Sequence, residues 1–287
     1  MRAWMLLNPR AGRKRAPTVR RTAERIAAEL GWSLETRVIG APGEGTTLAR
    51  EAVRQGADRV LAVGGDGTLN AVAAGLVGTN VALGVVAMGS GNGYARSLRL
   101  PLRPEAAVRH ALTAPPALLD VCRLNEHLFL GTAGIGFDAR VAWEFDKSTG
   151  RGMMGYARII VKEIVGATPM RVVVEVGGEV TEQRVLMMVF CNTREFGNGA
   201  VISPGSAPDD GLAELQLVRK PALLPLLKAL FDVYTGRADR NANVRTVVGR
   251  EARVHQEGTL AHLDGEPLEV GQEVRFRLEP RRLWVVR

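Results

Sequence analysis

Two glycine-dense turns in the first hundred residues hold the side chains best placed to do chemistry. The apolar run Val60–Val63 leads into the turn Gly64–Thr68, and Val81–Met88 leads into the turn Gly89–Gly93. Glycine lets the backbone turn tightly and approach a ligand closely. Where a helix follows such a turn, its backbone N–H groups and its dipole favour an anion such as phosphate. The two turns therefore predict a phosphate-binding site.

Asp66 is the unexpected member of the first turn, because a carboxylate repels phosphate. A divalent cation between the two explains its presence, and Mg²⁺ prefers carboxylate and phosphate oxygens. We therefore expect a magnesium–nucleotide site. The alternative is an ordinary glycine turn capped by Thr68, since short motifs carry a real false-positive risk. Two turns about one βαβ unit apart favour the site, because ligands of open α/β sheets bind outside the carboxyl ends of the strands.

The elements that must position these turns alternate between strand and helix patterns. The apolar run Trp4–Leu7 and a second expected strand, Leu34–Ile39, precede the two strands that end in glycine, and amphipathic patterns separate them. The order β-α-β-α-β-α-β predicts a parallel sheet with helices on both faces. A dinucleotide-binding fold is disfavoured, because its GxGxxG belongs at the first βα turn, which here is Asn8–Gly12.

After Pro115-Pro116 the pattern becomes mostly antiparallel β, so we place a domain boundary near residues 115–120. The predicted domains are 1–117 and 118–280. Two β-hairpins, two helical segments and a series of short strands up to Val286 are expected after this boundary. The hairpins pair Leu118–Leu124 with His127–Thr132 and Val172–Val176 with Val180–Phe190, and the helices cover Met153–Val165 and Ala222–Tyr234.

Composition narrows the classes of partner. The formal net charge of +8 favours an anionic partner: a nucleotide, an acidic lipid headgroup or a nucleic acid. Aromatic residues make up only 5%, and no recognisable nucleic-acid module is present, so no nucleic-acid partner is expected. No apolar stretch approaches the 18 residues of a membrane span, and the N-terminal apolar run is too short for a signal peptide. A cytoplasmic protein is expected.

The remaining candidates for metal or redox chemistry are few. Cys122 and Cys191 lie far apart in apolar runs, which predicts buried free thiols. The four histidines show no metal-ligand spacing and are expected to be surface or strand residues. Asp120 lies in an apolar strand, where an unpaired carboxylate is costly, so it is expected to have a partner or a function.

A set of short motifs, taken in order, resembles the bacterial diacylglycerol-kinase-like lipid kinases. This family shares its catalytic domain with sphingosine and ceramide kinases and is more distantly similar to NAD kinases and phosphofructokinases. The ordered set is far more specific than any of its members. It consists of Asn8-Pro9, Gly64–Asn70, Gly89–Arg96, Asp120, Gly134–Asp138, Asn192, Asp210-Gly211 and Asp264–Glu266.

The resemblance implies an α/β nucleotide-binding domain with a parallel sheet and a C-terminal, mostly antiparallel β-sandwich domain. It also implies an active-site cleft between the domains and a return of residues 281–287 to the first domain. Mg-ATP would be bound by residues of the three early turns: Asn8, Pro9, Gly64, Gly65, Asp66, Gly67, Thr68, Asn70, Gly89, Ser90 and Asn92.

The resemblance also implies roles for acidic residues of the second half. Glu266 matches the general base that takes the proton from the lipid hydroxyl, while Asp264 and Asp120 match acidic positions near the metal. A structural Mg²⁺ would be held by the Asp210 carboxylate and the carbonyls of Ala207 and Leu212. Structural explanations remain open, because Asp264-Gly265 is an ideal hairpin turn pair and PGSAPDDGL also fits an acidic turn. Gly134–Gly136 also fits a tight bend.

The resemblance predicts ATP-dependent phosphorylation of a lipid alcohol, diacylglycerol-like or sphingoid-like, at an anionic membrane surface that the protein contacts peripherally. Two departures leave the acceptor open: GSGNG replaces the usual GTxND, and Ile39 stands where a family threonine is expected. A soluble small-molecule kinase of the NAD-kinase type and a nucleotide-binding regulator without turnover are the alternatives. A homodimer is compatible with the sequence, which leaves the oligomeric state open.

Overall fold

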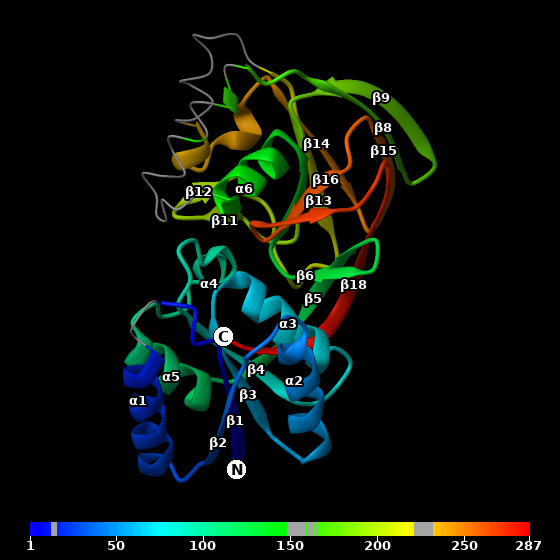
Figure 1. The fold of residues 1–287 in the computed structure, drawn as a ribbon. Coiled ribbons are helices and arrows are strands. Elements are labelled where there is room, and N and C mark those ends of the chain that lie inside the picture. Colours follow the sequence, from blue (N-terminus) through cyan, green and yellow to red (C-terminus); the bar gives the residue numbers. More distant parts are fainter. Residues whose placement is uncertain (13–15, 148–158, 160–162, 165, 221–231) are drawn as a thin grey trace. The chain divides into compact units, whose positions relative to one another are not determined.

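The computed structural model describes residues 1–12, 16–147, 159, 163–164, 166–220 and 232–287 (Figure 1). The chain divides into two compact units. The first unit contains Met1–Leu119 and Arg281–Arg287, and the second contains Asp120–Pro280. The two predicted helices at 153–165 and 222–234 lie mostly outside the described residues.

The first unit is built on a parallel sheet. Its strands are β1 (Arg2–Leu7), β2 (Ser33–Val38), β3 (Arg59–Gly64) and β4 (Ala82–Ala87), in the order β2-β1-β3-β4. The C-terminal end of β18 (Glu273–Val286) lies parallel to β4, with Val285 opposite Leu83. The central strands are almost wholly buried, which is why they appear in the sequence as continuous apolar runs.

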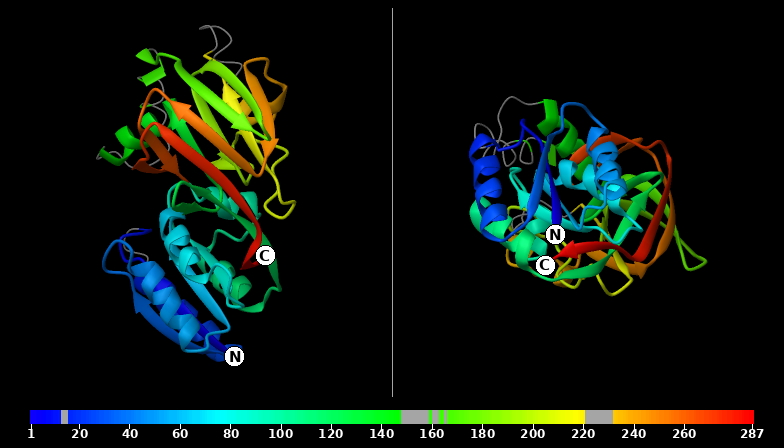
Figure 2. Two further views of the ribbon diagram at one scale, coloured as in Figure 1. Left: turned by 90° about the vertical axis from the view of Figure 1, so that its right-hand side faces the viewer. Right: turned by 90° about the horizontal axis from the view of Figure 1, so that it is seen from below.

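Helices cover both faces of this sheet, as Figures 1 and 2 show. Helices α1 (Ala16–Glu29) and α5 (Pro104–Thr113) pack on one face, and α2 (Glu44–Arg54) and α3 (Asp66–Leu76) on the other. A short helix, α4 (Gly93–Ser97), follows the second glycine turn. The α/β prediction with a parallel sheet is confirmed.

One local detail of α2 concerns Thr46, which lies in its first turn and does not cap it. The helix begins at Glu44, and the hydroxyl of Thr46 instead donates a 2.7 Å hydrogen bond to the carbonyl of Ala71 in α3. A Cβ at Gly75 would lie 2.6 Å from the Cβ of Ala49, so only glycine allows the two helices to pack this closely.

The second unit is mostly antiparallel β, as predicted. A six-stranded sheet has the order β14-β13-β10-β7-β16-β17. A second group of antiparallel pairs joins β18 to β15, β15 to β8, and β8 to β9, while β5 pairs with β6. The bounds of the first half are β5 (Pro116–Leu124), β6 (His127–Phe129), β7 (Thr132–Gly136), α6 (Phe137–Lys147), β8 (Met170–Val176), β9 (Glu179–Val185), β10 (Met187–Cys191), β11 (Glu195–Gly197) and β12 (Ala200–Val201). Those of the rest are β13 (Ala213–Val218), η2 (Ala238–Arg240), β14 (Val244–Gly249), β15 (Glu251–Gln256), β16 (Leu260–Leu263) and β17 (Glu266–Glu269).

Both predicted hairpins form, and both are shorter than expected. In the first, β6 ends at Phe129, and Thr132 begins β7 in the other sheet. The run Val180–Phe190 was expected to be one strand, and it is two: β9 ends at Val185, and β10 begins at Met187 in the other sheet. The N–H of Leu186 bonds to the carbonyl of Val218, and its carbonyl accepts the N–H of Phe137. This buried residue therefore marks the crossing between the two sheets.

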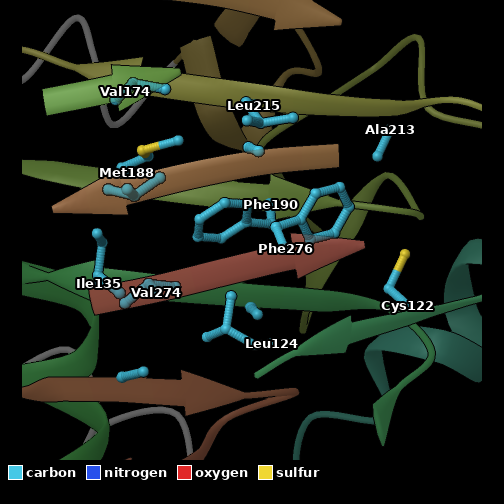
Figure 3. Close-up of a cluster of buried hydrophobic side chains, with 14 of the residues drawn as sticks. Cys122, Leu124, Ile135, Val174, Met188, Phe190, Ala213, Leu215, Val274 and Phe276 are labelled. Atoms are coloured by element: carbon cyan, nitrogen blue, oxygen red, sulfur yellow. The ribbon is translucent and has the colours of Figure 1, made fainter. Parts of the chain in front are cut away.

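Aromatic side chains from the two strand groups meet in the core of the second unit (Figure 3). The rings of Phe190 and Phe276 stack with centroids 5.1 Å apart. The alternation of exposed and buried residues along β15 and β18 directs one face of each strand into this core. Cys122 and Cys191 are buried free thiols, as predicted, and burial raises the pKa of both well above its ordinary value. Among the described helices, none has the length and apolar character needed to cross a membrane.

Candidate functional site

The first glycine turn joins β3 directly to α3. Gly64 ends the strand, Gly65 is the N-cap residue, and no side chain caps the helix. A Cβ at Gly64 would lie 2.4 Å from the hydroxyl oxygen of Thr68, so the backbone runs against the first turn of the helix. Because the first backbone N–H groups of a helix have no intrahelical acceptor, this turn offers donors to an anion.

The two glycine turns touch each other, as expected for neighbouring parallel strands. A Cβ at Gly89 would lie 2.8 Å from the Cα of Gly65 and 2.9 Å from Oδ1 of Asn92. Asn92 adopts a left-handed conformation with φ 53°, and its side-chain amide donates a 3.0 Å hydrogen bond to the carbonyl of Gly89. Gly89 therefore has no room for a side chain, whereas a Cβ at Gly65 would make an ordinary contact, 3.4 Å from the Cα of Gly89.

A third turn joins the same edge of the sheet through Asn8. Its Nδ2 donates a 2.9 Å hydrogen bond to the hydroxyl oxygen of Thr68, and its Oδ1 accepts the N–H of Arg10 at 2.9 Å. Pro9 and Ser90 are exposed, each within one of these turns. The structure therefore brings together the three turns that the sequence assigned to nucleotide binding.

Asp66 links the first glycine turn to the second. Its Oδ2 accepts the N–H of Gly93 at 3.3 Å, and its Oδ1 accepts the N–H of Tyr94 at 3.4 Å. Among the described atoms, Oδ1 of Asn92 is a buried acceptor without a hydrogen-bond partner. A cavity of about 10 Å³ lies here, lined by Ala62, Gly64, Gly65, Asp66, Leu69, Val85, Ala87, Asn92 and Ala95.

The side-chain oxygens at this edge of the sheet fit Mg²⁺ only in combination with phosphate oxygens. Within the described residues, no group of three or more His, Cys, Asp or Glu side chains could hold a metal ion by itself. Mg²⁺ is commonly held by one or two carboxylates together with substrate phosphates, and Asp66 can supply one such carboxylate. The chemistry of this edge of the sheet therefore suits a metal that arrives with a nucleotide.

In the second unit, Asp264 and Gly265 form the two-residue turn between β16 and β17. Their φ angles are 49° and 86°, the positive values that a type I′ hairpin turn requires. The Asp264 carboxylate accepts three backbone N–H groups, from Leu130 at 3.1 Å, Gly131 at 3.2 Å and Thr132 at 2.7 Å. This residue therefore anchors the hairpin to the segment between β6 and β7, and Glu266 follows as the first residue of β17.

Asp120 is fully buried and has a partner, as its position in an apolar strand predicts. Its Oδ2 accepts the N–H of Gly211 at 2.8 Å. Asn192 donates from Nδ2 to the carbonyls of Leu130, at 2.7 Å, and Asp120, at 3.3 Å. After burial, Asp120 and Asp264 are the next largest causes of the raised pKa of the Cys122 thiol. Because Leu130, which accepts from Asn192, also donates its N–H to Asp264, the segments that hold the two carboxylates meet in one region of this unit.

Asp210 lies in an exposed turn. Its Oδ1 accepts the N–H of Leu212 at 2.9 Å, the geometry of an aspartate turn. These contacts fit the acidic-turn alternative without a metal. A structural Mg²⁺ held by Asp210 with the carbonyls of Ala207 and Leu212 remains a prediction.

The structure brings together two residues for which no role was predicted: one of the four histidines and the last residue of the motif Gly134–Asp138. His262 is 3% exposed, and its Nε2 lies 3.1 Å from Oδ2 of Asp138, which is 7% exposed. The Nδ1 atom of His262 accepts the N–H of Gly265 at 3.3 Å. Asp138 ends the GIGFD motif, and His262 stands two residues before Asp264, so the spacing of the two motifs gave no signal of their contact.

We expect Gly134→Ala to destabilise the second unit. A Cβ at this position would lie 1.8 Å from Oδ2 of Asp138 and 2.7 Å from Nε2 of His262. Overpacking of this kind costs about 1–3 kcal/mol of unfolding free energy. Urea unfolding followed by circular dichroism measures it. Gly205→Ala is the matched control, because nothing lies within 4 Å of a Cβ there; equal midpoints for the two variants would contradict the packing described here.

Comparison with known proteins covers both units. The sequence pattern of the family described as Diacylglycerol kinase catalytic domain matches residues 2–124. The pattern described as YegS C-terminal NAD kinase beta sandwich-like domain matches residues 131–287.

Relatives and a solved structure extend over nearly the whole chain. A protein from Chromohalobacter salexigens named Probable lipid kinase YegS-like is 31% identical, covering 92% of this chain and 86% of that protein. A protein of the same name from Pectobacterium atrosepticum is 30% identical, covering 87% and 84%. The crystal structure of a diacylglycerol kinase from Bacillus anthracis str. Sterne has a TM-score of 0.81 at 20% identity, covering 99% and 96%, and shows the same fold. Because the two family patterns and these relatives span both units, the chain belongs to the YegS-like lipid kinase family, with a diacylglycerol kinase catalytic domain followed by a YegS C-terminal domain.

Proposed function

We propose that the protein transfers the γ-phosphoryl group of Mg-ATP to the hydroxyl group of a lipid. The observation that carries this proposal is the contact between the two glycine turns, bridged by the Asp66 carboxylate. Backbone N–H groups at the start of α3 suit the phosphates, and Asp66 suits the metal bound to them. The relatives are named as lipid kinases, which supports a lipid as the acceptor.

The second unit supplies the acid–base chemistry in this proposal. An alcohol attacking phosphorus gives up a proton, and a positioned carboxylate can take it. Glu266 is exposed and follows the hairpin turn directly. Asp264, the first residue of that turn, is fixed because its carboxylate accepts three backbone N–H groups. We assign Glu266 as the general base, and Asp264 and Asp120 as the acidic residues that shape its surroundings.

The net charge of +8 supports a lipid acceptor that is presented at an anionic surface. Peripheral contact with a membrane would bring the acceptor hydroxyl to a protein that has no apolar span among its described helices. Diacylglycerol-like and sphingoid-like acceptors both fit this chemistry, because each carries a primary hydroxyl beside apolar chains.

One observation favours a second candidate, a small-molecule kinase of the NAD-kinase type. The C-terminal pattern is described as NAD kinase beta sandwich-like, so this half is similar to a domain of enzymes with a soluble acceptor. The names of the relatives favour the lipid instead. A direct assay of acceptors separates the two.

The experiment incubates the protein with γ-labelled ATP and Mg²⁺ in the presence of diacylglycerol, sphingosine, undecaprenol or NAD, with lipids in mixed micelles. Label extracted with one lipid, and lost when EDTA removes Mg²⁺, is the expected result. Label in NAD alone would select the small-molecule kinase. Labelling of no acceptor, with ATP binding retained, would select a nucleotide-binding regulator.

A further inference from the structure

A chain of hydrogen bonds joins the first turn of α6 to the hairpin turn before Glu266. The N–H of Ala139 donates to Oδ1 of Asp138 at 2.9 Å, and Oδ2 of Asp138 lies 3.1 Å from Nε2 of His262. On its other side, Nδ1 of His262 accepts the N–H of Gly265 at 3.3 Å. The motifs Gly134–Asp138 and Asp264–Glu266, which lie far apart in the sequence, are therefore connected through the imidazole of His262.

The partners of this imidazole define its tautomer. A backbone N–H can only donate, so Nδ1 must accept, and the ring proton belongs on Nε2, where it is donated to Asp138. His262 and Asp138 are 3% and 7% exposed, so bulk water has little access to either partner. Asp138 thus selects the tautomer that can bind the hairpin turn.

The surroundings hold the ring in place. His262 stands opposite Gly134 in the ladder between β16 and β7, and the imidazole and the Asp138 carboxylate fill the space that a side chain there would need. The ring of Phe196 meets the imidazole edge-on, with centroids 5.9 Å apart. A ring packed on these sides has little freedom to turn away from Gly265.

The turn lies at one edge of its sheet. Strand β17 is an edge strand that pairs only with β16 in the described sheet. Asp264 is held by backbone N–H groups of residues 130–132, and Glu266 pairs with Leu263 in the ladder between β16 and β17. The N–H of Gly265, the residue directly before Glu266, is held by His262.

We propose that His262, oriented by Asp138, is a positioning residue that fixes the backbone of the turn and so the direction of the Glu266 carboxylate. This inference rests on the proposed role of Glu266 as the general base. A displacement of a catalytic group by about 1 Å can lower a rate by about 100-fold, so the loss of one anchoring bond has a measurable effect.

Two substitutions of His262 separate its two contacts. The side-chain oxygen in His262→Asn can take the place of Nδ1 and accept the Gly265 N–H, whereas the amide in His262→Gln can take the place of Nε2 and meet only Asp138. We expect His262→Gln to lower kcat about 10- to 100-fold, with the KM for ATP unchanged, and His262→Asn to stay within about threefold of the unsubstituted protein. The control is His255→Gln, an exposed histidine of β15 whose Nδ1 contacts Glu273.

Asp138→Asn tests the tautomer. The amide oxygen of the new residue would keep the Ala139 N–H, so its NH₂ group would face Nε2 and drive the ring proton to Nδ1, against the Gly265 N–H. Nitrogen-15 chemical shifts of labelled histidine report which ring nitrogen carries the proton, and the signals that vanish in His262→Asn belong to His262. We expect Nε2–H in the unsubstituted protein, Nδ1–H in Asp138→Asn, and a loss of kcat similar to that of His262→Gln.

The outcomes separate the inference from the proposed function. Turnover equal to the unsubstituted protein in His262→Gln, or a proton on Nδ1 in the unsubstituted protein, would overturn the inference and leave the kinase proposal intact. Equal losses of kcat in the Asn and Gln variants would also overturn it, because they would show that only the packing of the ring matters. Absence of turnover in the unsubstituted protein would defeat the proposed function itself, and with it any catalytic role for His262.

Discussion

Glu266→Gln is expected to abolish most phosphoryl transfer while leaving ATP binding unchanged. Glutamine has the shape of glutamate but cannot take a proton from the attacking hydroxyl. A general base contributes about 10²–10⁴-fold to a rate, so kcat should fall by that factor. Residue 266 is exposed on an edge strand, so the folded structure should tolerate the change. Initial rates with labelled ATP and the acceptor found in the panel give kcat, and calorimetric titration gives ATP affinity.

The matched control for this substitution is Glu269→Gln, at the other end of the same four-residue strand. Glu269 accepts the hydroxyl of Thr259 at 3.2 Å and has no place in the proposed chemistry. The control should keep the turnover of the unsubstituted protein. Full turnover in Glu266→Gln would remove the assignment of the base, whereas loss in both variants would indicate that the hairpin, and not one carboxylate, had been damaged.

Asp66→Asn is expected to remove the response to Mg²⁺. Asparagine keeps an oxygen that can accept an N–H from the second glycine turn, where Asp66 now contacts Gly93 and Tyr94. It loses the negative charge that favours a metal beside phosphate. The loss of one group that stabilises developing charge lowers rates by about 10²–10³-fold. We therefore expect kcat/KM for Mg-ATP to fall by that factor, with a change of less than about 1 kcal/mol in the unfolding free energy.

Rates measured over a range of Mg²⁺ concentrations, together with urea unfolding, test this expectation. Asp58→Asn is the control, because Asp58 also accepts a backbone N–H in the first unit, from Arg2 at 2.6 Å, but lies outside the glycine turns. If activity fell only as far as the loss of folded protein explains, Asp66 would be a structural cap of α4 and not a metal ligand. A steep loss of the Mg²⁺ response at unchanged stability is the result that the metal role requires.

The local backbone of both candidate regions could be predicted from the sequence. Strands that end in glycine predicted the positions of the two tight βα turns for which we propose phosphate binding, because few other residues allow such a turn. The pair Asp264-Gly265 predicted the hairpin turn that the structure contains, since both residues tolerate positive φ. The alternation of strand and helix patterns in the first half, and the run of strand patterns in the second, separated a parallel α/β half from an antiparallel half. The burial of Cys122 and Cys191 was predicted because both lie in apolar runs.

Only the tertiary structure decided which polar groups meet. Asp264 accepts N–H groups from residues more than 130 positions away, and Asp138 lies 124 positions from His262. Such contacts depend on the register between strands and on the space left by Gly134, and no local pattern encodes either. The same reason explains why Val180–Phe190 seemed to be one strand, because continuous apolar character does not show where a chain passes from one sheet to the other. Local sequence sets backbone conformation, whereas packing over long sequence separations sets the partners of each side chain.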